Sequence, residues 1–121
     1  MKKAESTQKV YRVIVEFENE ITKKDIQLLE NKLTNTTIKQ KTPTRVLHRR
    51  ADLTREKYIY DVKVKILSPQ KSEMKIRCQG GLYVKELVSG DDGRTTPSVS
   101  EILKNKAKPI NLDVLNVIME N

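Results

Sequence analysis

Two stretches of this sequence carry residues whose types and spacing could do chemistry, and the first is a run of cations. The segment KQKTPTRVLHRR, residues 39–50, contains no acid. Each cation can neutralise one phosphate of a nucleic acid backbone, and the planar fork of arginine suits two hydrogen bonds to one phosphate. The segment therefore favours a phosphate-binding track over an ordinary solvated loop. Its candidate nucleic-acid-binding residues are Lys39, Lys41, Arg45, His48, Arg49 and Arg50.

The second stretch, QGGLYVKELVSGDDGRTTPS, residues 79–98, holds all four glycines of the chain. Gly80 and Gly81 would let the backbone turn sharply and come close to a ligand. The ring of Tyr83 offers a surface for base stacking, and Lys85 can hold a carboxylate or a phosphate. The same residues also suit a plain turn between two elements, so residue types alone leave both interpretations open. The GDDGRT segment has too few ligand positions for a calcium loop and is predicted to be a turn.

The elements that would position these stretches show clear periodicity. Strands are predicted at 10–17, 36–42, 57–67 and 73–79, and a helix that begins at a Thr22–Asp25 capping box is predicted to run to Leu33. In the third strand the spacing places one set of side chains on one face: Tyr58, Tyr60, Val62, Val64 and Ile66. In the fourth strand Met74, Ile76 and Cys78 are expected inward, so Cys78 is interpreted as a core residue.

The C-terminal third predicts two short helices and a last strand. The first helix ends at Gly90, and the second begins at Ser98, with Glu101 in its first turn. Pro109 is expected to end that segment, and the strand after it is expected to place Ile110, Leu112 and Val114 on one side. This order predicts one α+β domain over residues 1–121, with a mostly antiparallel sheet and two or three helices. Residues 1–9 are polar and expected to be frayed.

Composition limits the class of protein. The chain has 121 residues, with 24 Lys and Arg against 16 Asp and Glu, and its net charge of +8 indicates a polyanionic partner. One cysteine and one histidine exclude an internal disulfide and a structural zinc site, so no metal is expected. The sequence contains neither a long apolar run nor a secretory signal. We therefore expect a cytoplasmic location and no membrane partner.

Taken in order, the two stretches resemble a known family. QKTPTRVLHRRADLTRE and QGGLYVKELVSGDDGRTTPSVSEIL are similar to the carboxy-terminal part of archaeal and eukaryotic tRNA pseudouridine synthases of the "Pus ten" type. The shared pattern is TP-x-R-V-x-H-R-R, then G-x-Y-V/I-K-E, then G-D-x-G-R-T-x-P-S. It covers residues 39 to about 115, and HRRAD favours the archaeal form. The whole pattern is specific for this family, whereas neither of the two stretches would be specific alone.

The resemblance implies a function. These enzymes use no cofactor to cleave the glycosidic bond of a uridine, rotate the base and rejoin it through carbon. Their substrates are uridines of the tRNA TΨC loop, conventionally positions 54 and 55, and the base must leave its stack. By the match of G-x-Y-x-K, Tyr83 would shape the pocket around the flipped base, and Lys85 would pair with the catalytic aspartate. In this interpretation Gly80 and Gly81 bring the chain close to the pocket.

One part of the family pattern is missing. The catalytic aspartate lies in a GRED-type motif well upstream of TP-x-R-V, and no such motif precedes that segment here. None of Asp25, Asp52, Asp91 and Asp92 matches it, and Asp52 is expected to pair with an arginine. We therefore expect the C-terminal part of a larger catalytic domain, which contributes half the active-site cleft and an RNA-binding surface and is inactive alone. The alternative is a non-catalytic, stand-alone RNA-binding module of the same fold.

The resemblance also implies partners. These are tRNA and the upstream part of the same enzyme. An uncovered apolar face is expected where that part is missing, and it could drive self-association.

Overall fold

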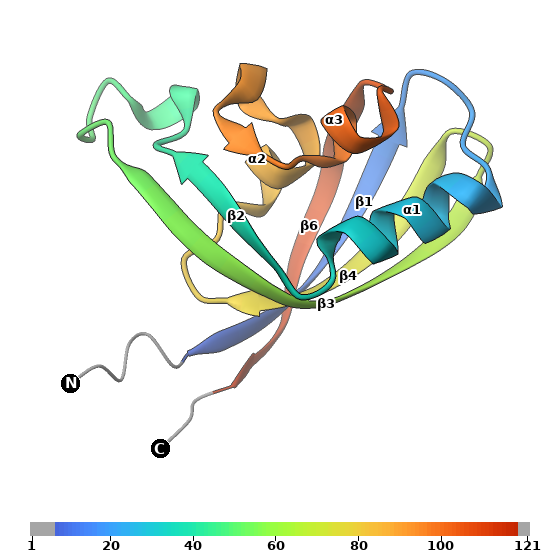
Figure 1. Cartoon of the computed structure of the whole chain (residues 1–121), viewed down its shortest axis with the longest axis horizontal. Helices are drawn as coiled ribbons and strands as arrows, with labels where there is room; N and C mark the ends of the chain where they lie inside the picture. The colour runs from blue at the N-terminus through green and yellow to red at the C-terminus, as the bar shows by residue number, and fades with distance from the viewer. Residues whose placement is uncertain (1–6, 119–121) are drawn as a thin grey trace.

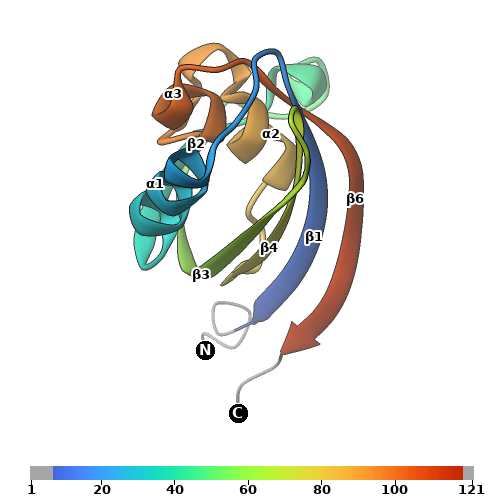
Figure 2. The ribbon, with the colours of Figure 1, turned by 90° about the vertical axis from the view of Figure 1, so that its right-hand side faces the viewer.

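The computed structural model describes residues 7–118, which form a strongly curved antiparallel sheet with its helices on one face (Figures 1 and 2). The strand order is β5-β2-β3-β4-β1-β6. The strands are β1 (Gln8–Phe17), β2 (Thr36–Lys41), β3 (Thr54–Ser68), β4 (Lys71–Gln79), β5 (Thr95–Thr96) and β6 (Ala107–Ile118). The helices are α1 (Lys23–Leu33), α2 (Val84–Ser89) and α3 (Val99–Leu103), with short 3-10 turns at Thr44–Val46 and Asp91–Gly93. This is the predicted α+β class; the two-residue strand β5 was not predicted.

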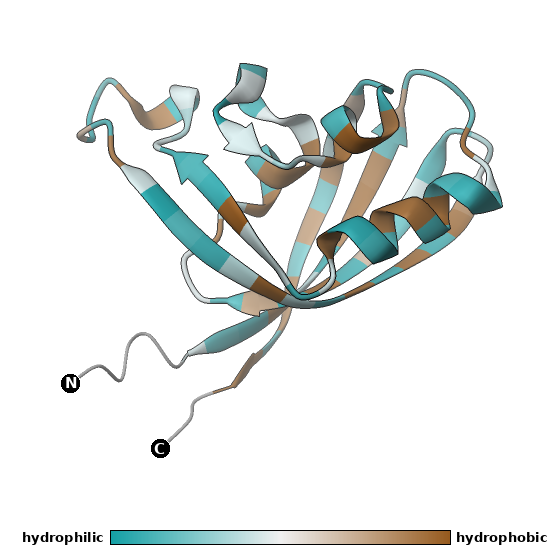
Figure 3. Cartoon of the chain, in the orientation of Figure 1, coloured by the Kyte–Doolittle hydropathy of each residue, from teal (hydrophilic) through white to brown (hydrophobic). Residues whose placement is uncertain are grey.

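The core lies between the helices and the concave face of the sheet. The alternation predicted for β1 is confirmed, because Val13 and Val15 are fully buried and Phe17 is almost fully buried. In β4, Met74, Ile76 and Cys78 are all fully buried, as predicted. Figure 3 shows hydrophobic bands on α1 and on the strands that it covers. Alternating strands and one apolar helix face thus enclose a single aliphatic core.

Helix α1 begins and ends where its local sequence predicts. The Thr22 side chain accepts from the backbone N–H of Asp25, and Asp25 accepts from the N–H of Thr22, which completes the capping box. Leu29 and Leu33 are fully buried against the sheet. The carboxylate of Glu30 also accepts from the backbone N–H of Val64 in β3 at 2.8 Å. Local capping and one buried face are therefore enough to explain this helix.

The prediction for β3 was wrong in its first half. The register shifts between Ile59 and Asp61, so two residues of β3 lie opposite Arg77 of β4. This bulge puts Ile59 in the core at 0% exposure, whereas Tyr58 and Tyr60 pack against each other on the other face. The Arg77 guanidinium lies 5.2 Å from the centroid of the Tyr60 ring. The tyrosines thus join an aromatic–cation cluster on the convex face instead of the core.

The start of β6 also differs from the prediction. Ala107 already pairs with Phe17, and Pro109 lies inside the strand opposite Val15. A proline is tolerated in β6 because β6 is an edge strand of the described sheet. On its open side there is no neighbouring strand that would need the N–H that proline lacks. Leu112 and Val114 lie opposite Val13 and Tyr11 with no register shift between them, so these two share a face as predicted, whereas Ile110 lies at the shift between Ile14 and Val15 and is displaced from it. Ile110 and Val114 are 44% and 57% exposed.

The expected fraying of residues 1–9 is only partly testable. Gln8 and Lys9 are paired on both sides within β1, against β4 and β6, so the expectation is wrong for these two residues. Residues 1–6 lie outside the described part of the chain. Within residues 7–118, no helix is long and apolar enough to cross a membrane.

Candidate functional site

The two candidate stretches of the sequence lie side by side. β5 pairs with the end of β2, so Gln40 lies opposite Thr95 and Lys39 lies opposite Thr96. Beyond the paired residues, the backbone N–H of Lys41 donates to the carbonyl of Arg94 at 2.9 Å. The N–H of Thr44 donates to the Asp91 carboxylate, also at 2.9 Å. The basic loop, defined here as residues 42–53, is therefore held against the GDDGR turn.

Arg94 completes this attachment. Its Nε and Nη2 donate to the backbone carbonyl of Thr42 at 3.2 and 3.0 Å, and Nη2 also donates to Asp52. The predicted pairing of Asp52 with an arginine is confirmed, and its partner is Arg94. Sequence reasoning missed this role of Arg94, although it is the only cation of the turn GDDGRTT. One guanidinium thus ties both ends of the basic loop to the glycine-rich segment.

Arg45, a predicted RNA-binding residue, is engaged with α2. Its Nε donates to Oε2 of Glu86 at 2.8 Å, and its Nη2 lies 3.4 Å from Oε1. Glu86 is only 7% exposed. The hydrogen bond to Glu86 raises the pKa of Arg45, and the charge of Glu86 adds to it. The fork of Arg45 is therefore occupied by a protein carboxylate, although about half of its side chain still reaches solvent.

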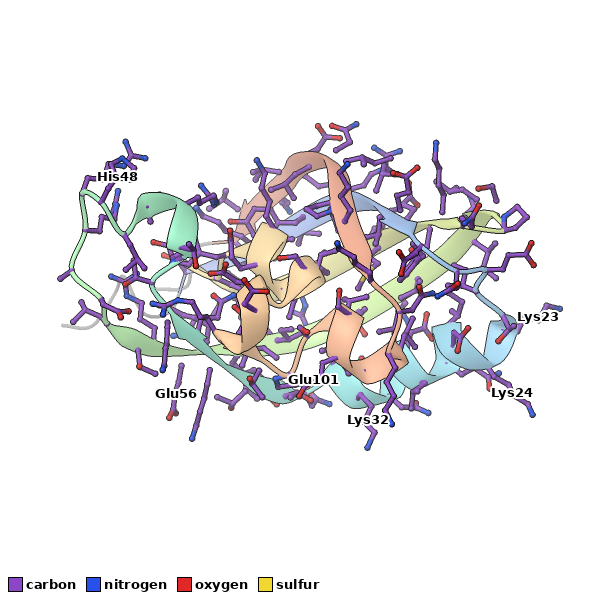
Figure 4. The ribbon with its side chains drawn as sticks, turned by 90° about the horizontal axis from the view of Figure 1, so that it is seen from above. Lys23, Lys24, Lys32, His48, Glu56 and Glu101 are labelled. Atoms are coloured by element: carbon purple, nitrogen blue, oxygen red, sulfur yellow. The ribbon has the colours of Figure 1, made fainter. Side chains whose placement is uncertain are left out.

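The other predicted phosphate ligands divide into two groups. Ile38 and Gln40 point into the core, so the alternate residues of β2, Lys39 and Lys41, project from the convex face. His48 lies in the exposed loop at one end of the molecule (Figure 4), and its neighbours Arg49 and Arg50 are exposed as well. A polyanion that contacts both groups has to pass around the end of β2.

The glycine pair places Tyr83 at the start of α2. Gly81 has φ +94°, a left-handed conformation that suits glycine, and a Cβ at this position would lie 3.0 Å from Nζ of Lys57. Gly80 donates its N–H to the carbonyl of Thr7. Tyr83 is then the N-cap of α2, and its hydroxyl lies 3.3 Å from Nη1 of Arg55 in β3. The ring of Tyr83 therefore faces the β2–β3 side of the sheet.

Lys85 faces a different strand. With four residues of β6, its exposed side chain lines a hollow of about 340 Å³: Pro109, Ile110, Asn111 and Leu112. Residues two apart on a helix point in different directions, and Tyr83 and Lys85 accordingly contact different strands. The structure therefore places these residues on two sides of the start of α2, with the β6 edge next to Lys85.

The β6 edge carries the largest exposed apolar side chains of this region. Ile110, Val114, Leu115 and Val117 are each between 44% and 57% exposed. The strand ends the described sheet, so one row of its backbone N–H and C=O groups lies open. An open edge lined by apolar side chains is the usual mark of an interaction surface.

Comparison with solved structures establishes the class of fold. The chain superposes on a chain of a Cbf5–Nop10–Gar1 complex with a TM-score of 0.72, at 17% identity, over 94% of this chain and 32% of that one. It also superposes on a chain of an H/ACA RNP bound to a substrate RNA containing 2′-deoxyuridine, with a TM-score of 0.62, at 14% identity, over 90% and 28% of the two chains. At these identities the likeness shows a shared fold.

The sequence itself establishes the family. Residues 1–118 match the family model described as Pus10, C-terminal, so the chain belongs to that family. It is 54% identical to the tRNA pseudouridine synthase Pus10 of Methanocaldococcus jannaschii over 109 residues, 90% of this chain and 24% of the relative. It is 49% identical to that of Korarchaeum cryptofilum over 115 residues, 95% and 31% of the two chains. The resemblance to the archaeal form is thereby confirmed.

The chain spans only part of these relatives. It covers 24% to 31% of the lengths of the Methanocaldococcus and Korarchaeum proteins and 28% of the Pyrococcus furiosus protein, to which it is 49% identical. Most of the relatives' length therefore has no counterpart in these 121 residues.

Proposed function

We propose that this chain forms the C-terminal part of a tRNA pseudouridine synthase that acts on uridines 54 and 55 of the TΨC loop. It supplies half of the active-site cleft and an RNA-binding surface. Membership of the Pus10 C-terminal family supports this proposal, as do the archaeal relatives named tRNA pseudouridine synthase. The observation that carries the proposal is the position of Lys85. Its side chain lines a hollow beside the β6 edge, which is unpaired in the described sheet and carries exposed apolar side chains.

Lys85 has the geometry to receive a carboxylate from outside the chain. Its side chain is exposed, and α2 packs against β6, so the ammonium group lies above an edge where another part of an enzyme can dock. No ion pair to Lys85 is present among residues 7–118. A carboxylate that enters this hollow gains a charge-assisted contact, which keeps it ionised and oriented toward the reacting nucleotide.

The chemistry is an isomerisation. The glycosidic bond of the target uridine is cleaved, the base rotates, and a carbon of the base rejoins the sugar, so the reaction needs neither net oxidation nor a cofactor. The base has to leave its stack first, and an aromatic ring such as that of Tyr83 can pack on the flipped base. In this scheme the residues of this chain orient the catalytic groups and bind RNA, and the reacting aspartate comes from the upstream part.

The β6 edge is the proposed docking site for that upstream part. Its open backbone groups can extend the sheet by one strand, and the four exposed apolar side chains would be buried in the process. The additional length of the relatives provides a covalently linked occupant. A second copy of this chain is the competing occupant, and the oligomeric state of the chain alone, with and without the upstream part, distinguishes the two.

A split between turnover and binding tests the role of Lys85. Lys85→Met should lower turnover far more than tRNA affinity in the enzyme assembled with its upstream part, since the lost contact orients a reacting carboxylate. Lys104→Met is the matched control, because Lys104 is also exposed but lies after α3, away from the hollow. If Lys85→Met weakens binding as much as turnover, Lys85 is a phosphate contact and the proposed cleft is wrong.

A further inference from the structure

Gln40 is a buried polar side chain that the basic loop and the family motif leave unexplained. It lies in β2 and is only 2% exposed. A carboxamide removed from water costs free energy unless its donors and acceptor are all paired. The hydrogen-bond partners of the Gln40 side chain therefore indicate the role of this buried residue.

Those partners converge on one residue. Nε2 of Gln40 donates to the backbone carbonyl of Tyr83 at 2.9 Å, and the backbone N–H of Tyr83 donates to Oε1 at 2.9 Å. The remaining Nε2 proton points to Oγ1 of Thr95 at 3.2 Å. The amide thus uses both donors and its acceptor, and it holds the peptide groups of Tyr83 as a neighbouring strand would.

This contact occurs at the start of α2, which lacks a side-chain cap. Tyr83 is the N-cap residue of α2, and its own side chain makes no capping hydrogen bond. The preceding Gly81 is in the left-handed region, so the chain before Tyr83 is locally permissive. Gln40 therefore fixes the direction in which the chain enters the helix.

The phenol hydroxyl of Tyr83 is contacted by the cross-strand neighbour of Gln40. Arg55 lies directly opposite Gln40 in the β2–β3 pairing, and its Nη1 is 3.3 Å from the Tyr83 hydroxyl. One cross-strand pair therefore contacts Tyr83 at two points, the backbone and the phenol. A base that stacks on this ring meets a surface whose position is fixed by β2 and β3.

We propose that Gln40 is a positioning residue, which sets the orientation of the Tyr83 ring for the flipped base. The proposal rests on the proposed function, in which Tyr83 shapes the pocket. Gln40 touches no substrate in this scheme. It acts through Tyr83, and its loss reduces turnover because the ring becomes free to move.

The test uses the chain assembled with its upstream part and three variants. Gln40→Met keeps the length of the side chain and removes all three hydrogen bonds. Gln40→Glu removes the donor to the Tyr83 carbonyl and retains an acceptor for its N–H. Val62→Ala is the control. Val62 is buried in β3, well beyond Arg55, the residue of β3 that pairs with Gln40, and its truncation only destabilises the fold.

We expect Gln40→Met to lower kcat on the order of tenfold with tRNA affinity nearly unchanged, at a temperature where all variants are folded. Val62→Ala should retain kcat there. Gln40→Glu should recover turnover as the pH falls and its buried carboxyl regains a donor proton, with no such rise in the unsubstituted enzyme. The recovery also tests the proposal if Gln40→Met fails to fold.

Two results would overturn the proposal in distinguishable ways. If Tyr83→Ala keeps full turnover, the role of Tyr83 in the proposed function is wrong and Gln40 has nothing to position. If Tyr83→Ala abolishes turnover while Gln40→Met and Gln40→Glu behave like Val62→Ala, the proposed function stands and Gln40 is a structural residue only.

Discussion

Arg45 of the basic loop and Glu86 of α2 form a two-pronged ion pair, with Nε 2.8 Å from Oε2 and Nη2 3.4 Å from Oε1. The pair joins the loop that carries the exposed cations to the helix that carries Lys85. It also separates Arg45 from its neighbours, because a guanidinium engaged with a buried carboxylate has less freedom to follow a phosphate. Within the run of cations, Arg45 therefore has a structural role that Arg49 and Arg50 lack.

Removal of Arg45 should destabilise the fold more than removal of its neighbour. Arg45→Ala leaves the buried Glu86 carboxylate without its partner, at an expected cost of about 1–3 kcal/mol in the free energy of unfolding. Arg49→Ala, the matched control, should stay within about 0.5 kcal/mol, since the side chain is exposed. Urea denaturation of the chain provides both values. Equal effects would show that the Arg45–Glu86 pair contributes nothing to stability.

The exposed cations of the basic loop should control the salt dependence of tRNA binding. Arg49→Ala combined with Arg50→Ala removes up to two phosphate contacts, so the slope of log Kobs against log salt should flatten by roughly 1–2. Lys23→Ala with Lys24→Ala removes the same charge from α1, at the other end of the molecule (Figure 4), and should leave the slope nearly unchanged. An equal change in both double variants would mean that net charge acts without a defined track.

The two adjacent glycines should respond differently to alanine. At Gly81 a Cβ would lie 3.0 Å from Nζ of Lys57, and φ is +94°, so Gly81→Ala should destabilise the fold by about 1–2 kcal/mol. At Gly80 a Cβ would meet ordinary contacts of 3.4 Å or more, and Gly80→Ala should be nearly neutral. Thermal unfolding of the two variants measures the difference. A neutral Gly81→Ala would show that the turn before Tyr83 tolerates another conformation.

Cys78 should be unreactive in the folded chain. Burial raises the pKa of its thiol to about 12, so almost no thiolate forms near neutral pH and reagents have no access. Alkylation at pH 8 should be slow without denaturant and fast in urea, and rapid labelling of the folded chain would contradict this prediction.

The thiol of Cys78 should also make the stability of the chain depend on alkaline pH, because its pKa is higher in the folded state than in the unfolded state. Its contribution to the free energy of unfolding is complete below the unfolded pKa and is lost as the pH rises toward 12. Cys78→Ala should therefore remove this loss of stability at alkaline pH.

Local signals predicted most of the fold. The β1 alternation, the Thr22–Asp25 capping box and the Gly90 helix end each depend on residues close in sequence, and all three are confirmed. The β3 bulge depends on β4, whose Gln79 accepts from the Tyr58 N–H through its side chain. The alternation of β3 alone cannot show such a cross-strand contact, so the two tyrosines were assigned to the wrong face.

The site was predictable by residue type but not by arrangement. The sequence shows that the cations of residues 39–50 cluster, and it cannot show that Lys39 and Arg49 lie on different surfaces or that Arg45 meets Glu86, 41 residues later. Gln40 gave no signal, because a glutamine in a polar strand reads as a solvent-facing residue. Its function depends on Tyr83, which only the folded chain brings within hydrogen-bonding distance.

The most direct test of the proposed half-cleft is a tRNA pseudouridylation assay with this chain, first alone and then with the upstream part of a Pus10 relative such as the Methanocaldococcus protein. We expect pseudouridine in the TΨC loop only when both are present, and Lys85→Met should abolish most of it. Turnover by this chain alone would show that the catalytic carboxylate lies within these 121 residues. Salt-sensitive tRNA binding without turnover in either mixture would instead support a non-catalytic RNA-binding module.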